Sequence, residues 1–264
     1  MRLAADAGVH VLAVTDHDTL AGVDEALAAG RSLGVRVVPG VELSVAAPSG
    51  SMHLLGYFRE PAPPPLLARL RELRAAREAR ARLIVERLAA AGAPISFDDV
   101  AARAAGPIGR PHIADAVVAA GHARDRQEAF DRFLADDGPA TAPHRGLTPE
   151  AAVRLVAESG GAPALAHPAS LRMAPDALSA LLSRLAAAGL RGIEVHRPDH
   201  APERRDAYAA LARRHGLVAT GGSDFHRPSD EVRPGDTGEP PLPADAVDRL
   251  LDGAAREPSA TLRS

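Results

Sequence analysis

The 264-residue sequence contains no cysteine and no tryptophan, and all 31 of its basic residues are arginine. The absence of cysteine excludes disulfides, thiolate zinc sites and cysteine nucleophiles. Aromatic residues make up only 3%, so Ala, Leu and Val must fill the core that a 46% hydrophobic content permits. No apolar run approaches the roughly 20 residues that span a bilayer, and no signal-peptide core is present. We therefore expect a cytoplasmic protein that does not cross a membrane.

The charge balance gives little reason to expect a polyanion partner. The formal net charge is -3, so a general basic surface for DNA is not expected. A phosphorylated substrate would need local positive charge, from metal ions or from a few arginines.

Apolar runs alternate with helical patterns in two parts of the chain, 1–59 and 144–264. Short apolar runs predict strands at 9–14, 35–38, 41–45, 52–58, 162–166, 192–195 and 217–221. Helical spacing predicts helices at 20–33, 149–159, 175–188, 202–215 and 244–255, with Thr148 as an N-cap. This alternation favours an α/β fold with a parallel sheet or barrel.

The segment 60–143 has a different character. A proline-rich stretch at 61–65 leads into helical patterns at 66–91, 97–105, 113–120 and 124–136, and no convincing strand pattern occurs. We interpret it as an all-helical insertion on the α/β part.

Metal-ligand residue types follow the predicted strands one after another. In parallel α/β folds, sites form at the carboxyl ends of the strands. The candidates are Asp16, His17, Glu42, His53, His167, Asp224 and His226. Any one of these histidines alone is more simply explained as a helix C-terminal partner or a hydrogen-bonded loop residue. Their recurrence at successive strand ends favours a site for Zn, Mn or Fe, with a carboxylate able to bridge two ions.

These motifs resemble the polymerase-and-histidinol-phosphatase (PHP) superfamily. The resemblance rests on Thr15-Asp16-His17-Asp18-Thr19, Pro39-Gly40-Val41-Glu42, His53-Leu54-Leu55-Gly56-Tyr57, Ala166-His167-Pro168 and Gly222-Ser223-Asp224-Phe225-His226. The helical segment with Ile108-Gly109-Arg110-Pro111-His112 resembles the branch of 3',5'-nucleoside bisphosphate phosphatases and 5'-3' exoribonucleases. It implies a distorted (β/α)7-type PHP barrel with a helical insertion.

The resemblance also implies roles for the candidate residues. Glu42 would bridge two ions, with Asp224 on the first ion and His53 and His167 on the second. His17 and His226 would hold a third ion. The ions would most simply be Mn, with Mg, Zn or Fe as alternatives, and would activate water and neutralise phosphoryl charge.

Other polar residues are implied to act around the ions. Asp16 and Asp18 would orient ligands or substrate, or they would simply cap the helix that follows. Arg110 and His112 would contact the substrate phosphate or ribose, unless Arg110 is solvated and His112 caps a helix. Arg145 and His200 are further candidates for the pocket lining.

One family motif has no counterpart here. The family opens with a strand carrying Asp-Leu-His-x-His, whereas this sequence begins in the helix expected after it, so we expect a barrel that lacks its first strand. Two hypotheses explain this: a misassigned start codon with roughly 20 to 30 residues missing, or a truncated gene with an impaired product.

The expected reaction is metal-dependent hydrolysis of a phosphomonoester, most simply the 3'-phosphate of a nucleoside 3',5'-bisphosphate, with 5'-3' trimming of short RNA as a linked activity. The alternatives are a phosphatase for another small metabolite such as histidinol phosphate, and a degenerate PHP module that binds without catalysis.

Overall fold

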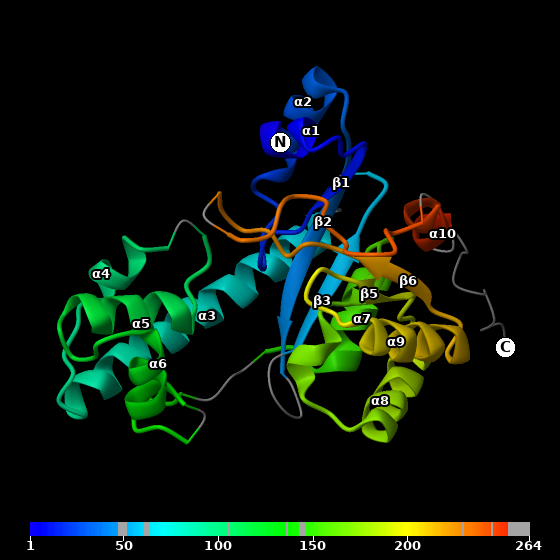
Figure 1. Ribbon diagram of the computed structural model, residues 1–264. Helices are drawn as coiled ribbons and strands as arrows, with labels where there is room; N and C mark the ends of the chain where they lie inside the picture. Colours follow the sequence, from blue (N-terminus) through cyan, green and yellow to red (C-terminus); the bar gives the residue numbers. More distant parts are fainter. Residues whose placement is uncertain are drawn as a thin grey trace, which may run out of the picture. The chain divides into compact units, whose positions relative to one another are not determined.

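The computed structural model describes residues 1–46, 52–60, 64–104, 106–135, 137–142, 146–228, 230–243 and 245–252 (Figure 1). The chain divides into two compact units, one formed by Met1–Leu67 with Leu147–Ser264 and the other by Ala68–Gly146. We refer to them as the sheet unit and the helical unit. The helical segment predicted from sequence, 60–143, begins before the helical unit, which starts at Ala68, and ends before Gly146.

The sheet unit contains a curled six-stranded sheet in the order β1-β2-β3-β4-β5-β6. The strands are β1 Val11–Val14, β2 Arg36–Val45, β3 Met52–Tyr57, β4 Ala162–Leu165, β5 Gly192–His196 and β6 Val218–Gly221. β1/β2, β4/β5 and β5/β6 are parallel, whereas β3 runs antiparallel to both of its neighbours. The α/β class with an open, barrel-like sheet is confirmed, but the sheet is mixed rather than parallel throughout.

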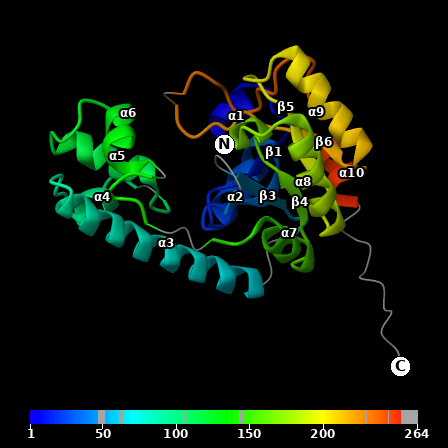
Figure 2. The same ribbon diagram turned by 90° about the horizontal axis from the view of Figure 1, so that it is seen from below.

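Helices cover this sheet and connect its strands. Those of the sheet unit are α1 Arg2–Asp6, α2 Val23–Leu33, α7 Pro149–Glu158, α8 Pro175–Ala187, α9 Pro202–Arg214 and α10 Ala246–Asp252, with a 3-10 turn at Pro168–Leu171. α2 packs on β2, α7 on β3 and β4, α9 on β5 and α10 on β6 (Figures 1 and 2). Thr148 caps α7 as predicted, since its hydroxyl accepts from the Ala151 N–H.

The predicted strands 35–38 and 41–45 are one continuous strand, so the break predicted at Pro39-Gly40 is wrong. Pro39 pairs with Val14 of β1, and Gly40 pairs with Tyr57 of β3. A Cβ atom on Gly40 would lie 2.7 Å from Thr15 Cγ2 and 3.1 Å from the Gly56 carbonyl oxygen. The glycine is therefore required by the close approach of neighbouring strands and does not mark a turn.

The helical unit forms its own apolar core. Its helices are α3 Pro64–Ala90, which begins in the sheet unit, α4 Phe97–Ala101, α5 Arg110–Ala119 and α6 Arg126–Ala129, followed by a π-helical turn at Phe130–Leu134. Ile84 and Leu88 of α3 pack with Ile113, Val117 and Leu134. No strand occurs among the described residues between Glu60 and Gly146, as the sequence pattern predicted.

The concave side of the sheet unit contains a second group of apolar side chains. Leu250 and Leu251 of α10 pack with Val38, Leu55 and Tyr57 of the sheet. β1 and β6 are the two edges of the sheet, and both border a cavity of about 1040 Å³. The helix predicted at 244–255 is described only as far as Asp252, and its last residues lie outside the described ranges. None of the described helices has the length and apolar content needed to cross a bilayer.

Candidate metal centre

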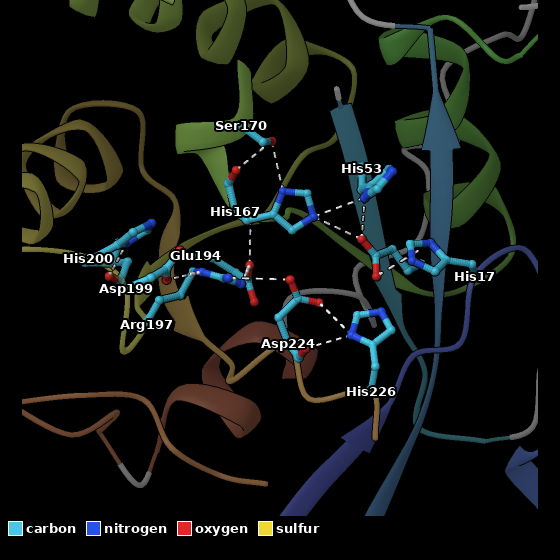
Figure 3. A network of polar contacts seen from close by, with 12 residues as sticks. His17, His53, His167, Ser170, Glu194, Arg197, Asp199, His200, Asp224 and His226 are labelled. Atoms are coloured by element: carbon cyan, nitrogen blue, oxygen red, sulfur yellow. Dashed lines mark hydrogen bonds and ion pairs between the residues drawn. The ribbon is translucent and has the colours of Figure 1, made fainter. Parts of the chain in front are cut away.

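Six side chains predicted as metal ligands line a single cavity of about 530 Å³: His17, Glu42, His53, His167, Asp224 and His226 (Figure 3). They come from β2 and β3 and from the segments that follow β1, β4 and β6. β1 to β4 are consecutive neighbours in the sheet and β6 is separated from β4 only by β5, so residues far apart in the sequence converge in this cavity.

Glu42, His53 and His167 bring three ligand-type atoms into a triangle. Glu42 Oε1 lies 2.7 Å from His53 Nδ1 and 3.1 Å from His167 Nε2, and the two nitrogens are 3.0 Å apart. Both nitrogens must donate to the carboxylate if both contacts are to be hydrogen bonds, and two donors cannot bond to each other. No placement of the ring protons therefore satisfies all three contacts at once.

Ser170 fixes the tautomer of His167. The Ser170 hydroxyl donates to the His167 carbonyl oxygen at 2.9 Å, so it accepts from Nδ1–H of the same ring, also at 2.9 Å. A hydrogen bond from Nε2 to the Glu42 carboxylate therefore requires the doubly protonated ring, and loss of that proton leaves Nε2 as a ligand atom directed at Glu42. Fixing the tautomer through the other ring nitrogen is the usual preparation of a metal-ligating histidine.

His17 adds a further donor beside Glu42. The ligand-type atoms of His17, Glu42 and His53 all lie within 4.8 Å of one another. His17 Nδ1 is buried 3.8 Å from Glu42 Oε2, and no described residue hydrogen-bonds to it. An unpaired buried ring nitrogen beside a carboxylate is costly in free energy unless a cation or water lies between them.

The donor spacing fits a divalent cation. Ligands held about 2.1 Å from a six-coordinate ion lie about 3 Å apart when they meet at a right angle. The three sides of the Glu42, His53 and His167 triangle measure 2.7, 3.1 and 3.0 Å. Imidazole and carboxylate donors together suit Mn, Fe and Zn. The residues present therefore fit a bound metal ion.

The electrostatics favour a charged carboxylate at the centre. Burial acts to raise the pKa of Glu42, but hydrogen bonds from His167 and His53 outweigh it and leave the pKa lowered. Burial likewise acts to lower the pKa of His167, and its bond to Glu42 leaves the pKa raised. For His17, burial prevails and lowers the pKa. Glu42 is thus a buried anion, and a buried negative charge favours binding of a cation beside it.

Asp224 and His226 lie at the more open side of the cavity. The His226 Nδ1 atom is 2.7 Å from the Asp224 carbonyl oxygen and 3.7 Å from Asp224 Oδ1. The rings of His17 and His226 are 5.8 Å apart between centroids. The pairing of His17 and His226 on a third ion stays a prediction, as does ligation by the other four residues.

Backbone strain is concentrated at this end of the sheet. Four described non-glycine residues have positive φ: Asp18 (51°), His167 (22°), Arg172 (51°) and Asp224 (55°). Three of them line the cavity, and Asp18 is next to His17, which also lines it. Such conformations cost about 1–3 kcal/mol each and persist where the surrounding structure holds a functional geometry.

Glu194 and Arg197 are functional candidates that the sequence motifs did not reveal. Glu194 on β5 is 4% exposed, and its Oε2 accepts from the His167 N–H at 2.6 Å. Burial raises its pKa. Arg197 contacts both Glu194 and Asp224. A charged residue in the otherwise apolar run Gly192–Val195 was the available signal, because buried charges need a partner.

Asp16 and Asp18 differ in their surroundings. Asp18 is 4% exposed, and its carboxylate accepts from the Ser44 N–H at 3.0 Å while its own N–H donates to the Glu42 carbonyl oxygen. It therefore ties the segment after β1 to β2 beside Glu42. Asp16 lines the larger cavity and accepts from the Glu42 N–H through its main-chain carbonyl. A direct role of either carboxylate in the reaction stays a prediction.

The residues predicted to contact substrate are distributed across the chain. Arg110 and His112 lie in the helical unit, where His112 Nδ1 accepts from the Gly109 N–H and Arg110 donates to the Leu134 carbonyl oxygen. His112 therefore caps α5, which was the alternative interpretation of this residue. Arg145 lies outside the described residues.

His200 was also predicted to line the pocket, but the structure places it at 2% exposure within the segment that joins β5 to α9. Its Nδ1 bonds to the Val195 carbonyl oxygen, and its ring stacks edge-on against Tyr208. Neither cavity includes it among the described residues that line them. These contacts support the chain after β5, and a contact of His200 with substrate stays a prediction.

Comparisons with known proteins find relatives that act on phosphate esters. No protein-family model matches the chain. It is 36% identical over 225 residues to the 3',5'-nucleoside bisphosphate phosphatase of Chromobacterium violaceum, covering 84% of this chain and 79% of that protein. It is 32% identical over 221 residues to a 5'-3' exoribonuclease of Haemophilus influenzae, covering 84% and 81%. It is 34% identical over 230 residues to a phosphoribosyl 1,2-cyclic phosphate 1,2-diphosphodiesterase of Eggerthella lenta, covering 84% and 85%.

Two solved structures share the fold over nearly the whole chain. An amidohydrolase from Chromobacterium violaceum, with bound sulfate and no metal, superposes with a TM-score of 0.82 at 33% identity, covering 96% of this chain and 89% of that one. A structure described as a metal-dependent phosphoesterase of Bifidobacterium adolescentis superposes with a TM-score of 0.78 at 33% identity, covering 95% and 88%.

Proposed function

Because the chain belongs to the PHP superfamily of metal-dependent phosphoesterases, we propose that it removes the 3'-phosphate from nucleoside 3',5'-bisphosphates. Hydrolysis of phosphate esters and use of a divalent metal follow from the relatives and from the donor set.

The observation that carries the proposal is the triangle of Glu42, His53 and His167, since its spacing suits a cation and no arrangement of protons satisfies it. These three residues would hold one ion, with His17, Asp224 and His226 available for others. A divalent ion there supplies Lewis-acid stabilisation of phosphoryl charge and lowers the pKa of water. Ser170 keeps the His167 ring oriented with Nε2 toward Glu42.

A bisphosphate substrate also needs positive charge away from the scissile phosphate. Arg172 is exposed, lines the 530 Å³ cavity and is held in a left-handed conformation at the end of the 3-10 turn that begins after His167. We assign it to the second phosphate, because a guanidinium binds phosphate oxygens in pairs. An R172A variant should raise KM for the bisphosphate at least tenfold and leave KM for p-nitrophenyl phosphate within twofold.

Trimming of RNA from its 5' end is a second candidate, supported by a relative of 32% identity that is a 5'-3' exoribonuclease. The same cavity would take the terminal nucleotide, with the rest of the chain outside it. Release of mononucleotides from a 5'-phosphorylated oligoribonucleotide, at a rate comparable to bisphosphate hydrolysis, would support this activity.

The proposal is tested by phosphate release from adenosine 3',5'-bisphosphate in Mn²⁺, with and without excess EDTA. We expect turnover that EDTA abolishes, Mn²⁺ restores and D224N lowers at least 100-fold. 5'-AMP, 3'-AMP, histidinol phosphate and phosphoribosyl 1,2-cyclic phosphate serve as competing substrates. A higher kcat/KM for one of them would overturn the substrate assignment, and Mn²⁺ binding without turnover of any would favour a non-catalytic module.

A further inference from the structure

Arg197 contacts three carboxylates at once in the polar network of Figure 3. Its Nη1 lies 3.2 Å from Glu194 Oε2, its Nε 2.9 Å from Asp199 Oδ1 and its Nη2 3.5 Å from Asp224 Oδ2. The Arg197 side chain is only 7% exposed. The guanidinium is rigid and planar, so these contacts fix the relative positions of the three acidic groups.

Two of those contacts lead directly to predicted metal ligands. Asp224 is itself one of them. Glu194 Oε2, the oxygen that meets Arg197, also accepts from the His167 N–H at 2.6 Å. Arg197 is thus one contact from Asp224 and two contacts from His167, which follow different strands.

The main chain of Arg197 is itself held in place by a neighbouring arginine, Arg205. Arg205 of α9 is 8% exposed and donates from Nη2 to the Arg197 carbonyl oxygen at 2.6 Å and from Nε to the His200 carbonyl oxygen at 3.0 Å. The segment after β5 is therefore anchored to α9. Because both the main chain and the guanidinium group of Arg197 are held, the side chain can keep its carboxylate partners in fixed positions.

The charge balance separates a positioning role from a substrate contact. One guanidinium faces Glu194, Asp199 and Asp224, so the group as a whole carries excess negative charge. Such a group attracts a divalent cation and repels a phosphate. Without the arginine, the carboxylates would repel one another and Asp224 would turn toward solvent.

We propose that Arg197 is a positioning residue that holds Asp224 directly, and His167 through Glu194, in the arrangement that binds metal. This inference rests on the proposed function, in which Asp224 and His167 are ligands. It predicts that Arg197 acts through metal affinity and not through substrate affinity.

The test compares Mn²⁺ affinity in R197Q, R197K and wild type, measured by competition with a chromogenic chelator. Loss of an outer partner of metal ligands typically costs 10- to 100-fold in affinity, so R197Q should raise Kd by that factor. R197K keeps the charge but meets fewer carboxylates, and its Kd should lie between the two. R36Q, which breaks an exposed ion pair with Asp248, is the matched control and should bind like wild type.

The outcomes distinguish failure of the positioning role from failure of the proposed function. Unchanged Mn²⁺ affinity in R197Q, or in R197K if R197Q does not fold, overturns the positioning role. A rise in KM for the bisphosphate at saturating Mn²⁺ with wild-type Kd for the metal would instead make Arg197 a substrate contact. A wild-type chain that binds no Mn²⁺ overturns the proposed function, and the positioning role with it.

Discussion

Replacing Glu42 by glutamine removes the charge at the centre of the site while keeping the shape of the side chain. Glu42 is 5% exposed, and its Oε1 contacts His53 Nδ1 at 2.7 Å and His167 Nε2 at 3.1 Å. A bound ion would replace both contacts with metal–ligand bonds, so the change in metal affinity comes from the lost anionic ligand. Loss of an outer partner of metal ligands already costs 10- to 100-fold in affinity, so loss of a charged ligand should raise Kd by about 100-fold or more, about 2.7 kcal/mol.

Calorimetric titration with Mn²⁺ measures this change directly. Thermal unfolding gives a second readout, because an ion that binds only the folded chain stabilises it in proportion to the logarithm of its concentration over Kd. The upward shift of Tm with Mn²⁺ in wild type should largely disappear in E42Q. E158Q, which alters an exposed glutamate at the end of α7, should keep the wild-type shift. If E42Q bound Mn²⁺ within tenfold of wild type, Glu42 would not be a ligand and the triangle would be only a hydrogen-bonded cluster.

Three further predictions concern the fold that supports the site. Burial raises the pKa of Tyr57, so the unfolded chain ionises first above the ordinary value of 10.0 and stability should fall as pH rises past it. Urea unfolding at pH 8 and pH 11 should show a larger loss in wild type than in Y57F, which keeps a smaller loss because burial also raises the pKa of Tyr208; an equal loss in both chains would contradict this. L182A removes a side chain of α8 that is fully buried and should cost about 2–5 kcal/mol in urea unfolding; a cost below 1 kcal/mol would contradict the packing described. A Cβ on Gly56 would meet both methyls of Val156 at 3.0 Å, so G56A should destabilise by about 1–3 kcal/mol, and strict additivity with V156A would refute this contact.

The helices and strands were largely readable from local patterns. α8 and α9 begin at Pro175 and Pro202 as predicted, because proline at the first helical position needs no N–H partner. β2 was predicted as two strands because a Pro-Gly pair such as Pro39-Gly40 normally marks a turn or loop. There the glycine serves the close approach of β1 and β3, which is a tertiary condition and leaves no local pattern.

The antiparallel direction of β3 could not be predicted from the sequence either. An apolar run such as Met52–Tyr57 has the same pattern whether it pairs parallel or antiparallel. Only pairing with β2 and β4 together places His53 beside His167, since Ala166 N–H donates to the His53 carbonyl oxygen at that crossing.

Glu42 lies within β2 and His53 at the start of the antiparallel β3, so the pairing of these strands sets their place. The convergence of the candidates that follow β1, β4 and β6 could be predicted, because the carboxyl ends of parallel strands meet at one edge of a sheet. The residues that hold them could not. Ser170, Glu194 and Arg197 belong to no metal-ligand motif, and they become meaningful only when the chain brings Glu194 within 2.6 Å of the His167 N–H. His200 was a candidate for the pocket lining from its place after a strand, but it is 2% exposed, and such burial depends on tertiary packing.

The sequence by itself determined the α/β class, the helical segment and the identity of the ligand-type residues, since each of these depends on spacing along the chain. The tertiary structure alone decided which of these side chains converge, because the distances between Glu42, His53 and His167 depend on strand order and direction. It also decided the positions of the residues that hold them, because the contacts of Arg197 with Glu194 and Asp224 join separate strands.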